Sequence, residues 1–124
     1  MTREASKALD TAERLLRTCD QLASIVELGR ESFEGELRTR WAIEMGLIRL
    51  GEEVSRLPES TREAYPGQPW RVIIGLRNMA AHQYDDLTSD RVWKTLTEDI
   101  PRLRDYVADV MLPGLRAPDP LDGA

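Results

Sequence analysis

Apolar residues return every three or four positions along most of this 124-residue chain, which is the spacing of one face of an α-helix. The first stripe runs through Ala8, Ala12, Leu15, Cys19, Leu22 and Val26. The second runs through Ile43, Leu47, Leu50, Val54 and Leu57, with Trp41, Met45 and Ile48 widening the same face. Nowhere do apolar and polar residues alternate as they do in a half-buried strand. The pattern therefore predicts an all-α protein.

Glycine and proline residues divide this pattern into separate helices. Gly29 is a natural stop for the first helix, the residues from Ser32 to Gly35 are expected to form a loop, and Pro58 ends the second helix. Residues 58–69 hold three prolines and a glycine, so they predict a connector with room for one short helical turn. Pro69 suits the first turn of a third helix, which carries Trp70 and the apolar residues after it.

The last part of the pattern predicts one more helix or a stacked pair. Residues 85–88 are expected to form a loop, after which Ser89 or Asp90 can cap a helix whose apolar residues extend to Val110. Pro101 interrupts that helix, either as a kink or as the start of a second helix capped by Asp99. Four or five helices with short connections predict an up-and-down antiparallel bundle.

Chain length and composition favour a single helical domain over residues 1–112. Residues 113–124 contain three prolines, two glycines and two acids, so we expect an acidic, disordered tail. No apolar run approaches the roughly 20 residues that cross a bilayer, and residues 1–16 are rich in acids and bases. We therefore expect a cytoplasmic protein with no membrane partner.

The net charge of −5 argues against general binding of nucleic acid, because phosphate affinity comes from clustered Lys and Arg. Any RNA site must then be local. A strip of arginines in the middle of the chain is interleaved with acids, which favours a solvated face of mixed charge. The strip consists of Arg38, Arg40, Arg49, Arg56 and Arg62.

The sequence offers little support for a metal or a cofactor. Cys19 is the only cysteine, which excludes an intrachain disulfide and a thiolate zinc site within one chain, and its place in an apolar stripe predicts burial. Glu52 and Glu53 are adjacent on a helix and therefore diverge. We expect neither a metal ion nor a cofactor.

The strongest chemical signal lies at the end of the third helix, around the only histidine, His82. Asn78 precedes it by four residues and shares its helix face, and the long side chain of Arg77 can bend toward the same patch. Metal-free RNA cleavage needs proton transfer and a positive charge on the phosphate, which an imidazole and a guanidinium supply. A purely structural alternative is a histidine that complements the helix dipole and an arginine that makes an ordinary surface ion pair.

One imidazole per chain also bears on the number of subunits. A mechanism with one histidine as base and another as acid requires two copies of His82 in a common cleft. A homodimer follows as a hypothesis.

The segment Arg77-Asn78-x-x-x-His82-x-Tyr84 resembles the R-x4-H-x-Y signature of HepT-like proteins in the HEPN superfamily. Three further segments are similar to landmarks of that family in the expected order: Leu50-Gly51-Glu52-Glu53 to I-G-E-A, residues 65–70 to Y-P-x-x-P-W, and residues 97–101 to its last helix. The resemblance covers roughly residues 5–112. Glu53 departs from the usual small residue and Gln83 from the usual residue after the histidine.

The resemblance implies a dimerising HEPN-like bundle that acts as a toxin, a metal-independent endoribonuclease with Arg77 and His82 as catalytic pair and Asn78 as positioning residue. It further implies a toxin-antitoxin pair in which a minimal nucleotidyltransferase antitoxin inactivates the toxin by AMPylation of Tyr84. The alternative is a non-catalytic HEPN module that only docks a nucleotidyltransferase.

Overall fold

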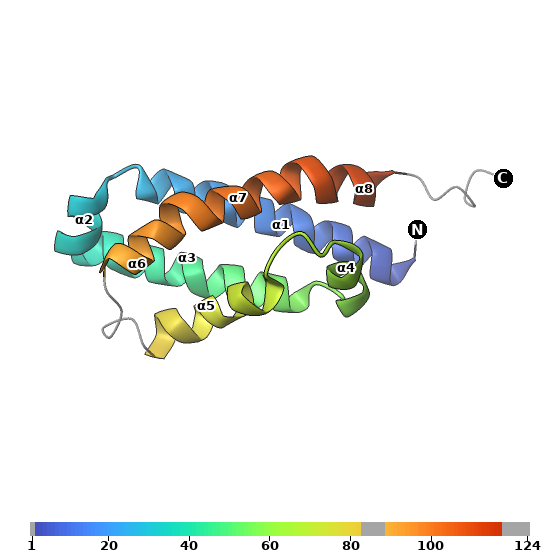
Figure 1. Cartoon of the computed structure of the whole chain (residues 1–124), viewed down its shortest axis with the longest axis horizontal. Coiled ribbons are helices and arrows are strands. Elements are labelled where there is room, and N and C mark those ends of the chain that lie inside the picture. The colour runs from blue at the N-terminus through green and yellow to red at the C-terminus, as the bar shows by residue number, and fades with distance from the viewer. Residues whose placement is uncertain (1, 83–88, 118–124) are drawn as a thin grey trace.

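The computed structural model describes residues 2–82 and 89–117, and all regular structure in these two ranges is helical. Three long helices, α1 (Arg3–Val26), α3 (Leu37–Arg56) and α5 (Trp70–His82), run alternately up and down. A fourth rod runs back along them through α6 (Ser89–Lys94), α7 (Ile100–Tyr106) and α8 (Leu112–Arg116) (Figure 1). The predicted all-α, antiparallel bundle is thereby confirmed. None of the described helices has the length and apolar character of a membrane span.

The predicted apolar stripes form one buried core between the rods. Leu15 and Leu22 of α1 meet Leu47 and Leu50 of α3, all nearly inaccessible to solvent. The last rod adds Val92, Leu96, Ile100, Leu103 and Val107. Each fully buried aliphatic side chain of this size contributes about 1.5–3 kcal/mol, so these stripes supply the main force that holds the helices together.

Two residues of the second stripe lie outside this core, contrary to the prediction. Trp41 is 62% exposed and Met45 is 53% exposed on the outer face of α3. Trp41 precedes the buried Ile43 by two residues, and Met45 precedes the buried Leu47 by two, so each is rotated by about 200° from a core residue. The apolar residues of α3 therefore span a wider arc of the helix than its neighbouring helices cover.

Three connecting regions complete the bundle. The residues expected to form a loop before α3 instead belong to a short helix, α2 (Arg30–Gly35), which follows Gly29 at a φ of +96° and buries Phe33 against Trp93. The connector after Pro58 contains the expected short helical turn, α4 (Glu59–Ala64). The predicted loop at 85–88 lies outside the described residues.

The last rod bends through two π-helical turns rather than breaking into separately capped helices. In η2 (Thr95–Asp99) and η3 (Val107–Met111), the closing N–H donors are those of Ile100 and Leu112, each directly before a proline. Proline has no N–H to continue an α-helical ladder, and the extra residue in the turn absorbs this loss. Asp99 is helical and its side chain caps nothing, so the alternative of a second helix capped by Asp99 is wrong.

The helical structure also passes the predicted domain end at residue 112. Residues 113–116 belong to α8, where the sequence led us to expect the start of a disordered tail. Leu115 packs partly against the core, which explains why the helix continues. Residues 118–124 lie outside the described part of the chain.

Candidate active site

Helix α5 carries the predicted motif. Its first turn is held in place by contacts within residues 65–70 and between these residues and the last rod. The indole N–H of Trp70 donates to the carbonyl oxygen of Tyr65 at 2.8 Å. The backbone N–H of Gly67 donates to the hydroxyl of Tyr106 at 3.1 Å, and the Tyr106 ring meets Trp70 edge to face. These bonds fix where α5 begins relative to the last rod.

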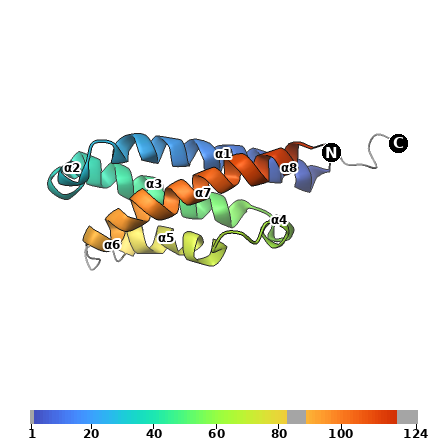
Figure 2. The ribbon, with the colours of Figure 1, turned by 45° about the horizontal axis from the view of Figure 1, so that its top comes forward.

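Gly51 brings α3 and α5 into close contact at the first motif residue. A Cβ added at Gly51 would lie 2.9 Å from both the Cβ of Arg77 and the carbonyl oxygen of Ile74. Real Cβ atoms do not approach backbone so closely, so only glycine permits this spacing. In Figure 2, α3 lies between α1 and α5, and this glycine faces the α5 side.

The inner face of α5 is apolar, and the two motif residues whose side chains are described lie outside that face. Ile73, Leu76 and Ala80 are buried, Arg77 is half-buried and Asn78 is exposed. Within the described part of the chain, Arg77 has no ion-pair partner.

The rest of the motif is described only in part. His82 is the last residue of α5, one turn beyond Asn78, but its side chain lies outside the described residues, as does Tyr84. The structure therefore places Arg77 and Asn78 on one helix end with the backbone of His82. The roles assigned to these four residues remain predictions.

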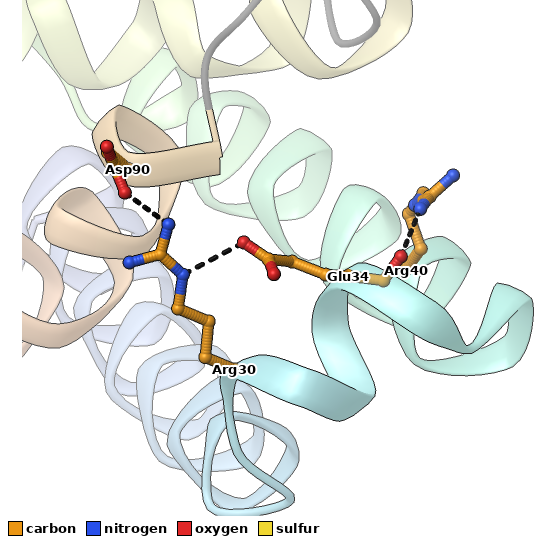
Figure 3. Close-up of polar contacts among 4 residues, drawn as sticks. All are labelled: Arg30, Glu34, Arg40 and Asp90. Carbon is orange, nitrogen blue, oxygen red and sulfur yellow. Dashed lines mark hydrogen bonds and ion pairs between the residues drawn. The ribbon is translucent and has the colours of Figure 1, made fainter.

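A polar cluster that the sequence did not predict fixes the end of the bundle where α6 begins (Figure 3). The guanidinium of Arg30 donates to Glu34 at 2.9 Å and also pairs with Asp90 in the first turn of α6. Arg40 donates to the backbone oxygen of Glu34 at 2.6 Å. These bonds raise the pKa of Arg30, which keeps its charge. The cluster ties α2 and α3 to the start of α6, where the described chain resumes after α5.

A charged groove between α1 and α3 is a second candidate site. We call it the α1–α3 groove; it has a volume of about 420 Å³ and is lined by Arg14, Arg17, Thr18, Gln21, Arg49, Glu52, Glu53 and Arg56. The predicted basic strip contributed only Arg49 and Arg56. The i, i+3, i+7 spacing of Arg14, Arg17 and Gln21 on α1 is the sequence signal that could have shown the opposite wall.

Glu53 is the half-buried carboxylate at the base of this groove. It accepts a hydrogen bond from the Thr18 hydroxyl at 2.9 Å, while its other oxygen is buried without a partner among the described residues. Burial raises the pKa of Glu53, and the Thr18 bond and the charges of Arg49, Arg56 and Arg14 oppose that rise. The carboxylate that departs from the family pattern thus lies in the field of three arginines, Arg14, Arg49 and Arg56.

Cys19 occupies the core side of α1, as predicted. Burial, followed by the charges of Asp20 and Glu53, raises the pKa of its thiol to about 12. A thiol with such a pKa is protonated and a poor nucleophile at neutral pH. Across residues 2–82 and 89–117, no group of three or more His, Cys, Asp or Glu residues is arranged to hold a metal ion.

Comparison with known proteins supports the family resemblance. Residues 15–110 match the family described as "Ribonuclease HepT-like". The chain is 29% identical over 100 residues, 80% of its length and 89% of the relative's, to "Putative RNase TTE0752" of Caldanaerobacter subterraneus subsp. tengcongensis. It is 31% identical to "Probable ribonuclease HepT" of Thermococcus cleftensis over 63% of its own length and 71% of the relative's. No solved structure matches.

A family match over three quarters of the chain, in a fold of the expected class, is sufficient for assignment. The protein belongs to the HepT-like ribonuclease family of the HEPN superfamily.

Proposed function

We propose that the protein is the toxin of a toxin-antitoxin pair and cleaves RNA without a metal ion at the outer end of α5. The observation that carries this proposal is the placement of Arg77. Its backbone is fixed against Gly51, it has no ion-pair partner within the described residues, and it precedes His82 on the last turns of one helix, in a chain of the HepT-like family.

The chemistry follows from the side chains of the motif. One imidazole removes the proton of the RNA 2′-hydroxyl, and that oxygen attacks the adjacent phosphorus. The bond from phosphorus to the 5′-oxygen breaks, and an imidazolium returns a proton to that leaving oxygen. Arg77 stabilises the extra negative charge on the phosphate during the attack, and Asn78 orients the group beside it.

Base and acid act on opposite sides of the phosphorus, so the proposed site uses His82 from each of two copies. The outer face of α3 supports such a homodimer, because Leu37, Trp41 and Met45 form an exposed apolar stripe at i, i+4 and i+8. Helical rotation places Leu37 and Trp41 within about 80° of the direction in which Gly51 faces α5. The part of the stripe formed by Leu37 and Trp41 therefore lies toward the helix that carries the motif.

In this proposal the antitoxin is a minimal nucleotidyltransferase, and it transfers AMP from ATP to the hydroxyl of Tyr84, releasing pyrophosphate. An adenylate two residues from His82 adds bulk and negative charge where an RNA phosphate must bind. Modification therefore prevents cleavage.

The test compares purified wild type with Arg77→Ala, His82→Ala and Asn78→Ala on RNA in the presence of EDTA, together with growth on induction. We expect Arg77→Ala and His82→Ala to lose cleavage by about 10²–10⁴-fold and to relieve growth arrest, with a smaller loss for Asn78→Ala. Arg71→Ala is the matched control, because Arg71 is an exposed arginine of the same helix outside the motif. Wild-type cleavage by His82→Ala would disprove catalysis by this motif.

The same set of variants distinguishes the second candidate function, a non-catalytic module that docks a nucleotidyltransferase, from the ribonuclease. It predicts no cleavage by wild type and unchanged binding of the transferase by His82→Ala.

The regulatory step is tested with Tyr84→Phe, which should cleave RNA but gain no AMP mass when incubated with ATP and the transferase. Equal modification of wild type and Tyr84→Phe would exclude Tyr84 as the acceptor.

A further inference from the structure

The α1–α3 groove lies away from the motif on the opposite side of α3. Gly51 faces α5, whereas a Cβ added at Gly46 would meet Leu22 of α1, and Glu53 bonds Thr18 of α1. The groove is therefore a surface separate from the end of α5, and the proposed cleavage chemistry does not use its residues.

Positive charge gathers in this groove although the chain as a whole carries −5. Four guanidinium groups and two carboxylates line it, which leaves two positive charges in excess. Arg56 approaches Glu52 at 4.0 Å, whereas Arg14, Arg17 and Arg49 make no ion pair within the described residues. Three arginines on two facing helices thus lack a close ion-pair partner, and the charges of Arg14 and Arg49 are only partly balanced by Glu53.

The charge continues along α1 beyond the groove. An adjoining depression shares Arg14 and Arg56 with it and adds two bases, Arg3 and Lys7, and one acid, Asp10. From Arg3 to Gln21 this track follows α1 for about 27 Å, given a rise of 1.5 Å per residue. A track of that length suits several successive nucleotides of a single strand rather than one isolated phosphate.

The lining residues distinguish a polyanion from a protein as the occupant. All eight residues of the groove are polar or charged, and none is aromatic or aliphatic. Protein interfaces are centred on buried aromatic or aliphatic anchors, whereas contacts to a nucleic-acid backbone come from Arg, Lys, Thr and Gln side chains. We infer that the α1–α3 groove binds the phosphate backbone of the RNA, holding the strand on a face separate from the cleavage site. This inference rests on RNA as the substrate of the proposed function.

The test measures binding without cleavage. The probe is a fluorescent single-stranded RNA of mixed sequence with 2′-O-methyl groups, which keeps every phosphate but cannot be cut through the 2′-hydroxyl. Anisotropy titrations at several salt concentrations compare wild type with Arg17→Gln/Arg49→Gln. The matched control is Arg102→Gln/Arg116→Gln, which removes the same charge from exposed positions on the last rod. Circular dichroism confirms that all three proteins fold.

We expect the groove variant to bind about tenfold more weakly at low salt and its log–log salt dependence to fall by about 1.4, because each phosphate contact on a single strand contributes about 0.7. The control should resemble wild type. Equal binding by the groove variant and wild type would overturn the inference, as would equal losses in both double variants, which would indicate net charge alone. Loss of transferase binding without loss of RNA binding would assign the groove to a protein and also overturn it.

The outcome is separable from that of the proposed function. If wild type cleaves RNA and the groove variant binds normally, the motif stands and the groove assignment fails. If the groove variant alone loses binding while wild type cleaves no RNA, the groove assignment stands and the endoribonuclease proposal fails.

Discussion

Helix α3 has two exposed borders of opposite chemistry. Leu37 and Trp41 lie on the side of α3 toward α5 and Met45 lies on its outer face, all three more than half exposed, whereas Arg49 and Arg56 line the groove toward α1. An exposed aromatic and aliphatic stripe is stabilised by covering it with another protein surface, whereas a guanidinium cluster is stable in water and attracts anions. In our proposals, one helix therefore offers a surface for a second subunit on one side and a surface for RNA on the other.

Substitutions in the apolar border are expected to have the largest effect on RNA cleavage. In a two-fold dimer each substitution occurs twice, so Trp41→Asp/Met45→Asp places four carboxylates in the proposed interface. We expect a monomer in sedimentation equilibrium and a loss of cleavage of about 100-fold or more, because a single chain has one imidazole. Val110→Asp is the control, an exposed apolar residue on the last rod. A monomeric variant with full activity would refute the shared site.

A substitution at Gly51 tests the close spacing of α3 and α5 without changing the charged or apolar residues on the exposed sides of α3. Gly51→Ala forces α5 outward at Ile74 and Arg77, so we expect a loss of about 1–3 kcal/mol in the free energy of unfolding and reduced cleavage. At Gly75 an added Cβ meets nothing within 4 Å, so Gly75→Ala should instead stabilise the helix by about 0.5–1 kcal/mol. Urea denaturation of the two variants measures this difference in sign. Equal stabilities would show that the close contact at Gly51 does not constrain α5.

The sequence predicted those features that depend on one helix at a time. The inner residues of α1 and α3, the start of α5 after Pro69 and the burial of Cys19 follow from spacing and from proline. Tertiary contacts decide the rest. Periodicity alone could not show that Trp41 lies beyond the reach of neighbouring helices, nor that Phe33 finds a partner in Trp93 and so favours a helix at α2.

The candidate sites also divide into residues that a local motif predicts and residues that only tertiary packing brings together. A local motif supplied Arg77, Asn78 and the position of His82 at the end of α5. The α1–α3 groove has no local motif, because its walls come from residues 14–21 of α1 and 49–56 of α3, which are well separated in the sequence. Only the packing of α1 on α3 brings Arg17 and Arg49 to one surface, and it also explains the unusual Glu53 as a carboxylate held between cations.

Glu53 provides the smallest effect and the sharpest test of the charged border. Burial raises its pKa, so the folded state binds more protons than the unfolded state just above pH 4.5, and stability falls as pH rises through the folded pKa. Glu53→Gln removes this loss. At pH 7 we expect a gain of about 0.5 kcal/mol or less, because Glu53 is only partly buried and solvent screening weakens the effect. The gain should shrink on acidification.

The same substitution should tighten binding of the 2′-O-methyl RNA, since it removes a negative charge from the α1–α3 groove and keeps the shape of the side chain. Glu52→Gln is the matched control for stability, because Glu52 is a more exposed neighbour, yet it should also tighten binding because it lines the groove. If the groove binds phosphate, both variants should therefore raise the affinity for RNA. Only Glu53→Gln should clearly raise the stability of the protein. Tighter binding by neither variant would show that the carboxylates of this border do not face the RNA.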